Sequence, residues 1–390
     1  MKKYIILAAA AVAALAACSK VEQTSDVQKE INFQVANRIQ TKATDGVVYN
    51  NGAFGTYAWY TANAASVTAQ TGSDHAEFMV NETVDLVNGV WKTSVNTFYW
   101  PKTGSVDFIS YSPFAGTNGT AGNVPAIDQD SIEYTGVVAG NVDLMYADKV
   151  NCSSNVNEVT DTNNGTNADS GYQGVPTIFR HALAKLSFKI KANFVEYTDA
   201  TTNKKTEWDV TVTSAKISGF KTTGDCALSL NADGKTWDKP ETNLGTANDP
   251  EIVNVWTNLD GTSAEQELIS ASTYPEGVLL TTAPQDLAAA SGYVMPQVLA
   301  ADTQKLELQI HIKTHLSNGK TIDEDYNPVI DIKDISSLKA WEMNQNIVYT
   351  INIKPVSYVS SYDNPNDVII TFDPAVADWT PVDATATIQL

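Results

Sequence analysis

Cysteine is scarce in this sequence, which has three cysteines in 390 residues. Cys18 ends an apolar N-terminal run, and Cys152 and Cys226 stand far apart in the chain. Small secreted domains that depend on disulfides carry a denser, even-numbered cysteine pattern. A disulfide framework is therefore not expected, and one bridge between Cys152 and Cys226 is the alternative.

Motifs of enzymes and metal sites are also lacking. The sequence has no G-x-S-x-G elbow, no H-E-x-x-H, no C-x-x-C pair and no Walker loop. His311 and His315 lie on one expected strand, where residues four apart are separated by about 13 Å and cannot share an ion. We therefore expect no enzyme activity, no cofactor and no metal.

Other polar and aromatic residues have structural explanations. Asp323, Glu324 and Asp325 are adjacent in a stretch that reads as a turn. His181 stands among apolar residues and is expected to be a hydrogen-bonded structural histidine. Most of the eight tryptophans stand beside strand signals, where packing in a core is the default and a carbohydrate platform is the alternative.

Basic residues are few. The chain has 25 Lys and Arg against 45 Asp and Glu, which gives a net charge of -20. An acidic excess of this size disfavours charge-driven binding to nucleic acid or to an anionic membrane face. We therefore expect no nucleic-acid partner.

Helical periodicity is scarce, and short alternating segments take its place. In one of them Leu186, Phe188 and Ile190 share a face. Such strands, separated by Gly, Asn and Asp turns without helices between them, predict antiparallel β-sandwiches. A polar stretch from 151 to 172 precedes a fresh start of the pattern, so we predict an all-β chain with two tandem sandwiches. The predicted domains are 31–178 and 179–390.

The N-terminus has the features of an exported lipoprotein. Its apolar run ends at Ala17 and is too short for a bilayer-spanning helix, which needs about 20 apolar residues. The sequence "LAAC" that ends at Cys18 has the small-residue pattern of a lipobox, in which the cysteine is acylated and the chain is cut before it. We predict a signal peptide at 1–17 and a flexible lipidated tether at 18–30. The alternative is an ordinary secretory peptide cut after Ala17.

The first predicted strand follows this tether. The segment "EINFQV" alternates, with Ile31, Phe33 and Val35 on one face. Arg38 and Lys42 come next, as the nearest cations on a segment that is expected to be exposed. A trypsin-like protease could therefore cut the chain at either residue.

Segments from residue 98 to residue 379 carry a family resemblance. They read "FYWP", "VDFISYSPF", "DLMYAD", "FRHALAKLSFKI", "YVMPQ", "WEMNQNIVYTINI" and "VIITFDPAVADW". In this order they resemble the fimbrillin-like pilins, the lipoprotein precursors of type V pili. The match is to the family and not to one member.

The resemblance implies a fold and an assembly route. The fold is a pair of transthyretin-like β-sandwich domains, and the route begins with export to the outer membrane through lipid on Cys18. A surface protease would then cut after Arg38 or Lys42 and displace the strand at Ile31–Val35, and a neighbouring subunit would fill the groove with a strand of its own. Arg38 is slightly favoured, because proteases of this system are often arginine-specific.

The donor strand is expected near the C-terminus, where two segments alternate. One reads "DVIITFDPAV" and the other reads "ATATIQL". On the apolar face the second segment begins with Ala384 and Ala386, which fill little of a pocket, so both segments remain candidates. A capping tip subunit would need no donor. The candidate donor residues are Val368, Ile370, Phe372, Ile388 and Leu390.

The sequence thus predicts a structural or adhesive subunit of a cell-surface pilus. Its partners would be other pilus subunits, the outer membrane and a ligand on a host or bacterial surface. One alternative is a stand-alone glycan-binding surface lipoprotein, which needs no cut at Arg38 or Lys42 and stays monomeric after one. The other is a secreted glycoside hydrolase, which would need two carboxylates about 5 to 9.5 Å apart in one cleft.

Overall fold

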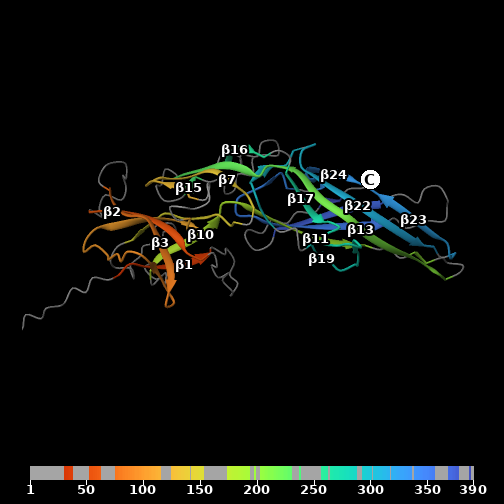
Figure 1. The fold of residues 1–390 in the computed structure, drawn as a ribbon, viewed down its shortest axis with the longest axis horizontal. Coiled ribbons are helices and arrows are strands. Elements are labelled where there is room, and N and C mark those ends of the chain that lie inside the picture. Colours follow the sequence, from red (N-terminus) through yellow and green to blue (C-terminus); the bar gives the residue numbers. More distant parts are fainter. Residues whose placement is uncertain are drawn as a thin grey trace, which may run out of the picture.

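Strands make up almost all of the regular secondary structure in the described residues (Figure 1). In the computed structural model the described residues contain a single short helix, α2 (Ile332–Ile335). This confirms the predicted all-β class. The described residues are 30–37, 52–62, 75–115, 124–140, 142–152, 174–193, 197–198, 203–230, 237–238, 256–261, 264–287, 292–300, 302–316, 318–335, 338–355, 368–376 and 386–387.

The first sheet closes on itself. Its strands follow the order β2-β3-β4-β1-β10-β8-β5-β9, and β2 also pairs with β5. We call the closed path from β2 to β5 the circuit; each of its strands has a neighbour on both sides, which leaves no strand of the path at an edge. The bounds are β1 (Asn32–Asn37), β2 (Phe54–Thr61), β3 (His75–Val87), β4 (Val90–Thr93), β5 (Ser105–Ser112), β8 (Met145–Ala147), β9 (Val150–Cys152) and β10 (Val175–His181).

Aromatic side chains fill the circuit. Phe33, Phe54, Phe108 and Phe179 are all buried in one cluster, which we call the circuit core. The ring centroid of Phe54 lies 5.6 Å from that of Phe33 and 5.3 Å from that of Phe179, in edge-to-face arrangements. Such contacts add to the free energy gained by burying the rings.

A second sheet covers one outer face of the circuit. It runs β15-β14-β7-β6, and β16 pairs with β14. Trp59 and Ile109 of the circuit pack there against Tyr134, Cys226 and Trp256 of this cover sheet. Every residue of β5 is buried, because cores lie against both of its faces. The bounds are β6 (Ala126–Ile127), β7 (Ser131–Val138), β14 (Thr223–Leu230), β15 (Trp237–Asp238) and β16 (Trp256–Asp260).

The cover sheet joins distant parts of the sequence. Strand β14 pairs with β7, with Leu228 opposite Ile132. Residues 178 and 179, between which the sequence predicts a domain boundary, both lie within β10. The division into 31–178 and 179–390 stays a prediction, and strands from residues 223–260 pack with the first of these ranges.

The later strands form a second body with a core of its own. One sheet runs β19-β11-β26-β27-β28 with β20 on β11; another runs β12-β13-β22-β23 and also holds β17, β18 and β24; β21 pairs with β25. Leu186, Phe188 and Ile190 are buried in this core, as their alternation predicts. The bounds are β11 (Ala184–Ala192), β12 (Tyr197–Thr198), β13 (Lys205–Phe220), β17 (Ala264–Ile269), β18 (Val278–Leu279), β19 (Gln285–Asp286), β20 (Gly292–Val294), β21 (Gln297–Val298), β22 (Lys305–His315), β23 (Thr321–Tyr326), β24 (Val329–Asp331), β25 (Ala340–Trp341), β26 (Asn346–Pro355), β27 (Val368–Val376) and β28 (Ala386–Thr387).

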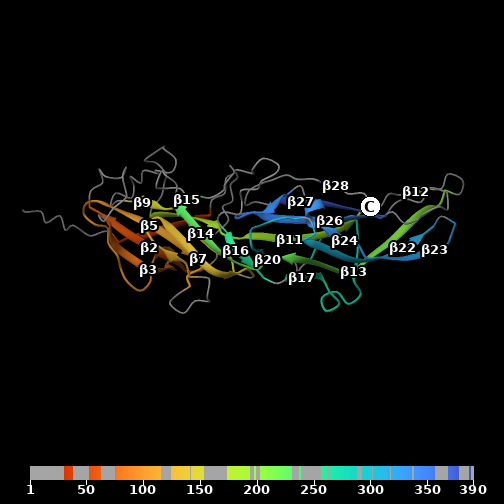
Figure 2. The same cartoon turned by 90° about the horizontal axis from the view of Figure 1, so that it is seen from above.

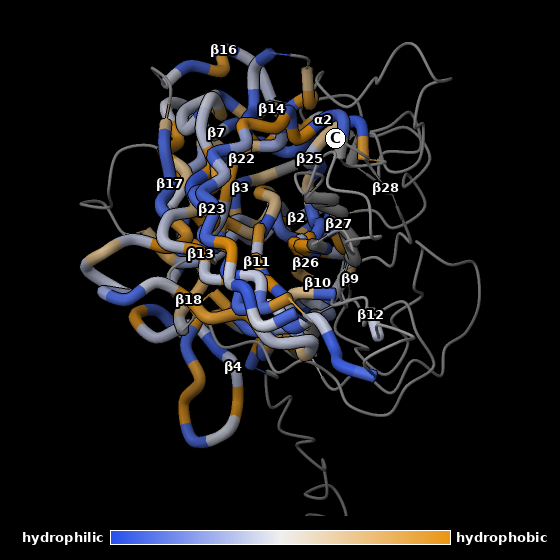
Figure 3. Tube along the Cα trace, turned by 90° about the vertical axis from the view of Figure 1, so that its right-hand side faces the viewer, coloured by the Kyte–Doolittle hydropathy of each residue, from blue (hydrophilic) through white to orange (hydrophobic). Residues whose placement is uncertain are grey.

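The two bodies lie end to end. Figures 1 and 2 show the circuit and the cover sheet at one end of an elongated molecule, and β13, β22 and β23 reaching the other end. The end-on view in Figure 3 shows polar and apolar stretches alternating along the strands. This alternation is what a strand with one buried face requires.

Two strand pairs are parallel. Strand β1 runs parallel to β10, and β11 runs parallel to β26. The prediction of purely antiparallel sandwiches is therefore wrong at these pairs. The reason is that an alternation with a period of two is the same for a strand of either direction, so the pattern carries no information about its neighbour.

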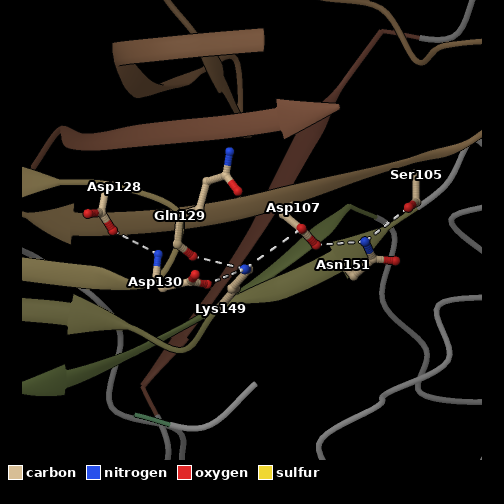
Figure 4. A network of polar contacts seen from close by, with 7 residues as sticks. All are labelled: Ser105, Asp107, Asp128, Gln129, Asp130, Lys149 and Asn151. Atoms are coloured by element: carbon tan, nitrogen blue, oxygen red, sulfur yellow. Dashed lines mark hydrogen bonds and ion pairs between the residues drawn. The ribbon is translucent and has the colours of Figure 1, made fainter. Parts of the chain in front are cut away.

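A buried polar network ties the circuit to the start of the cover sheet (Figure 4). The Nζ atom of Lys149 lies 3.8 Å from Oδ2 of Asp107, and the two side chains are only 6% and 3% exposed. Lys149 also donates a hydrogen bond to the carbonyl of Gln129 at 2.9 Å and lies 3.5 Å from Oδ1 of Asp130. Asn151 donates to Oδ1 of Asp107 at 2.6 Å, so both oxygens of that buried carboxylate have partners.

Lys149→Met is expected to destabilise the folded protein by about 3 to 5 kcal/mol, because it leaves Asp107 buried without its cation. The matched control is Lys189→Met, since Lys189 pairs with Asp286 at the surface, where side chains are 39% and 78% exposed. That change is expected to cost less than about 1 kcal/mol. Urea unfolding followed by tryptophan fluorescence measures both, and equal losses would contradict the structural role given to Lys149.

Candidate functional site

Strand β1 occupies an interior position in the circuit (Figure 1). On one side it pairs in parallel with β10, with Phe33 opposite Val175. On the other side it pairs with β4, with Phe33 opposite Trp91. The amide of Ile31 donates a further hydrogen bond to the carbonyl of Phe98 at 2.9 Å. The strand is therefore bonded to the rest of the circuit along both edges.

The apolar side chains of this segment enter the circuit core. Ile31 is 1% exposed and Phe33 is 4% exposed, while Val35 is half-buried against the same cluster. The ring of Phe33 lies between those of Phe54 and Phe108, at centroid distances of 5.6 and 5.8 Å. The face that alternation gives to Ile31, Phe33 and Val35 is thus the inner face. Their displacement remains a prediction.

A glycine lets β1 lie close to the strand beside it. A Cβ atom at Gly174 would come within 2.8 Å of the carbonyl oxygen of Asn32 and 2.9 Å of the carbonyl carbon of Phe33. Any side chain at this position would push against the backbone of β1. Sequence reasoning missed this residue, because a glycine before a strand gives no sign of which backbone lies against it.

The predicted cleavage sites follow β1 in the sequence. The strand ends at Asn37, directly before Arg38. Arg38, Lys42 and the predicted lipidation site, Cys18, lie outside the described residues. The sequence has only one other arginine, Arg180. Arg180 is 7% exposed, and its Nε and Nη2 atoms donate to the two carboxylate oxygens of Asp148 at 3.0 and 2.9 Å.

The two donor candidates differ in how they pair. Strand β27, which carries Val368, Ile370 and Phe372, pairs with β26 along its whole length, from Val368 to Val376. Strand β28 pairs with β27 only at Ala386 and Thr387. Ile388 and Leu390 lie outside the described residues. Backbone bonding therefore holds the first candidate in its own sheet much more firmly than the described part of the second.

The histidines whose side chains are described, His181, His311 and His315, each lie beside a carboxylate. His311 lies 2.8 Å from Asp325, and His315 lies 3.0 Å from Asp209, so the two rings have different partners. No group of three or more His, Cys, Asp and Glu that could hold a metal occurs in the part of the chain that is described. Nδ1 of His181 lies 2.7 Å from a carboxylate oxygen, which confirms the prediction of a hydrogen-bonded residue.

The acidic run at Asp323, Glu324 and Asp325 is part of strand β23, so its assignment to a turn is wrong. Cross-strand cations explain the difference. Asp323 faces Lys313 and Asp325 faces His311 on β22. Opposite charges across a strand pair stabilise side chains that would disfavour a strand by propensity.

The tryptophans whose side chains are described pack in or against the hydrophobic cores. Trp100, Trp256 and Trp341 are at most 3% exposed, and Trp59 and Trp208 are 6% and 8% exposed. The indole of Trp256 also donates to the carbonyl of Ala182 at 3.0 Å. These residues offer no flat exposed platform for a sugar.

Both described cysteines are free and buried. Cys152 belongs to the circuit core, and burial raises its pKa to about 12. Cys226 lies under the cover sheet, where burial also raises its pKa. Since they lie in separate cores, the alternative of a bridge between them is wrong. No helix in the described ranges has the length and apolar character needed to cross a membrane.

Gly174→Ala is expected to weaken the pairing of β1 by about 1 to 3 kcal/mol, because the new methyl group overlaps the backbone of β1. Amide hydrogen exchange in residues 31–37 is expected to become faster. Gly140→Ala is the control, since a Cβ at Gly140 would have no heavy atom within 4 Å. Equal exchange in the two variants would show that Gly174 does not control how β1 fits.

Comparisons with known proteins give the chain a family. The model of the fimbrillin-like family matches residues 41–379. A fimbrial protein from Bacteroides vulgatus has 16% identity and a TM-score of 0.52, with 90% of this chain and 100% of that chain covered, which indicates a shared fold. A candidate cell adhesion protein from Bacteroides uniformis has 18% identity and a TM-score of 0.40, with 92% and 100% covered. No curated protein matches significantly. Since the family match extends over most of the sequence, the chain belongs to the fimbrillin-like family.

Proposed function

We propose that the chain is a structural or adhesive subunit of a cell-surface pilus that assembles by protease-triggered strand exchange. The observation that carries this proposal is the position of β1. It closes the circuit, it supplies Ile31 and Phe33 to the circuit core, and it ends one residue before Arg38. One cut in the sequence directly after this strand would separate it from the rest of the chain.

Export as a lipoprotein would bring the precursor to the place of assembly. A signal peptide at 1–17 and lipid on Cys18 would attach it to the outer membrane, with the tether at 18–30 leading to β1. The tether and β1 both precede Arg38. A cut there would therefore release the subunit from its anchor in the same step that frees β1.

Loss of β1 would create a site that another strand can fill. It would leave the facing edges of β4 and β10 without partners and would empty the places of Ile31 and Phe33. Each large apolar side chain that refills such a place contributes roughly 1.5 to 3 kcal/mol. Each restored backbone hydrogen bond adds about 0.5 to 1.5 kcal/mol. A whole strand thus provides enough free energy for a long-lived contact between subunits.

The opened subunit would keep much of its structure. Trp59 and Ile109 of the circuit would remain packed on Tyr134 and Trp256 of the cover sheet, because none of the β1 side chains that the structure describes belongs to that core. The bidentate pair of Arg180 with Asp148 likewise does not involve β1. These contacts support a cleaved subunit that is folded around an open groove.

The segment with Ile388 and Leu390 is the donor that is easier to release from its own subunit. Leaving its own subunit would cost the described part of that segment two paired positions, at Ala386 and Thr387. The segment with Val368, Ile370 and Phe372 would have to give up its pairing with β26 along the whole strand. The latter stays as the second candidate, because its side chains are larger.

A stand-alone glycan-binding surface lipoprotein is the rival proposal. It accounts for the lipobox, but Trp100, Trp256 and Trp341 are buried and cannot contribute to the aromatic platform that would favour it. Other pilus subunits are therefore the proposed partners, and the pilus at the cell surface is the proposed location. The fimbrillin-like family supports the same location.

An arginine-specific protease is expected to cut the folded protein, beginning at Ser19, only after Arg38. Arg180 should resist, because it is buried and bonded to Asp148. Intact mass is expected to show loss of the N-terminal piece, and size-exclusion chromatography a shift to oligomers or filaments. Arg38→Gln is the control and is expected to stay intact and monomeric; trypsin applied to this variant then tests Lys42.

Cleavage without any change in size would contradict self-assembly as a stalk subunit. A tip subunit that only accepts a strand, or the glycan-binding rival, would then be favoured. Resistance of the wild-type protein at both Arg38 and Lys42 would contradict the protease trigger itself.

Cysteine labelling is expected to report the opening of one core. At pH 8 the folded precursor should react slowly with thiol reagents, because burial raises the pKa of both thiols and the thiolate is the reactive form. Once β1 has been cut and removed, labelling of Cys152 should become faster, since it shares a core with Phe33. Cys226 is the internal control and should stay protected. Mass spectrometry of the labelled peptides measures both, and equal rates would argue against selective opening.

A further inference from the structure

A charged pair lies at the beginning of β1. Nζ of Lys92 on β4 lies 3.2 Å from Oε1 of Glu30, and each side chain is 33% exposed. Glu30 forms an isolated bridge with Tyr99 just before the strand begins. Lys92 itself stands opposite Asn32. The pair therefore joins the residues just before β1 to β4. A strand that replaces β1 would also have to pair with β4.

The next polar position of β1 is a poor fit. The side-chain oxygen of Asn32 is buried and accepts no hydrogen bond. A buried polar atom without a partner costs free energy, because it has lost its bonds to water. A strand without a carboxamide at this position would avoid that cost. The groove thus favours some replacements over β1 itself.

Both donor candidates share the charge pattern of β1. The segment of β1 reads E-I-N-F-Q-V from Glu30, one donor reads D-V-I-I-T-F from Asp367, and the other reads D-A-T-A-T-I from Asp383. In each, a carboxylate comes directly before the first residue of the inward-facing set. Neither donor has a carboxamide at the position of Asn32, where Ile369 and Thr385 would stand.

We propose that Lys92 sets the direction and register of the incoming strand. The strand enters parallel to β10, as β1 does, with a carboxylate in the place of Glu30. Asp367 there brings Val368, Ile370 and Phe372 into the places of Ile31, Phe33 and Val35. Asp383 there brings Ala384, Ala386 and Ile388 into the same places, so this second donor fills the two most buried places with alanines and is expected to bind more weakly. This inference rests on the proposed strand exchange and names the chemistry that the groove selects: an alternating strand with an acidic residue directly before its first apolar residue.

Other placements lose the charged contact. A slip by one residue turns every apolar side chain to the wrong face, and a slip by two moves the carboxylate about 7 Å along the groove. A reversed strand would bring the carboxylate to the end of β10 near Phe179. The next residue there, Arg180, is already bonded through its guanidinium to Asp148.

The test uses full-length protein cut after Arg38 and freed of its N-terminal piece. Fluorescent peptides of residues 382–390 and 366–374, amidated at the C-terminus, serve as donors, and a peptide of residues 30–37 serves as the reference. Asp383→Asn, Asp367→Asn and Glu30→Gln are each expected to weaken binding about two- to fivefold, the range of a partly exposed ion pair. With Lys92→Met protein, each acid and its amide should bind equally.

A charge swap provides the second variant. Lys92→Glu protein is expected to bind the Asp383→Lys peptide more tightly than the unchanged peptide, which reverses the wild-type preference. Direction is tested by disulfide trapping. The Asp383→Cys peptide should be captured by Lys92→Cys protein and not by Ile178→Cys protein, because Ile178 lies opposite Ala36 at the far end of β1. Both proteins carry Cys152→Ala, because Cys152 is expected to become reactive once β1 is gone.

The failures of the two proposals can be told apart. If the 30–37 peptide and both donor peptides fail to bind, strand exchange into this groove is wrong, and the role of Lys92 is lost with it. If the peptides bind but the acid and amide forms bind wild-type protein equally, the role of Lys92 is wrong and strand exchange stands. Capture at Ile178→Cys would overturn the parallel direction.

Discussion

The packing of Phe33 between Phe54 and Phe108 is the contact on which the first body depends. It places a side chain of β1 at the centre of the aromatic cluster, while the backbone of β1 joins β4 to β10. Core and backbone pairing are therefore supplied by the same short strand. Removal of β1 would therefore take away both at once. This coupling suits the proposed release of β1 by cleavage, because opening the circuit and emptying its core would occur in one step.

The cover sheet gives the first body a second source of stability. Strand β5 separates two cores, with Phe108 in the circuit core and Ile109 under the cover sheet. The proposed opening of the circuit would expose the first core, whereas no described residue of β1 belongs to the second. The buried pair of Lys149 and Asp107 lies near this boundary and joins β5 to the segment that enters β7. The strand that is proposed to leave, β1, thus belongs to a different core from the one that β7, β14 and β16 form with the outer face of the circuit.

Local features of the fold could be predicted from the sequence, whereas its connections could not. Alternation identified the strand with Leu186, Phe188 and Ile190 and the buried face of β1, because a strand with one buried face repeats every two residues. It could not reveal that β1 lies parallel to β10 or that β2 closes onto β5, since pairing partners far apart in sequence leave no mark on either strand. The acidic residues of β23 were misassigned for the same reason: the cations opposite them lie on β22. Lys92 and Gly174 could not be identified from the sequence, because their neighbours in space are far away along the chain. Lys92 lies beside the carboxylate of Glu30, and Gly174 lies against the backbone of β1.

The pairing of β7 with β14 also imposes an order on biosynthesis. When the ribosome has completed the strands of the circuit, β6 and β7 have been made, but the face with Trp59 and Ile109 still lacks the part of its cover that β14 and β16 supply, because residues 223–260 have not been made. A nascent chain that folded at that stage would present an apolar sheet surface to its neighbours, which is a common cause of aggregation. Contacts between residues so distant in sequence also form slowly. A chain with this topology benefits from staying unfolded until its synthesis has passed residue 260, so its connectivity favours folding late in translation or after it.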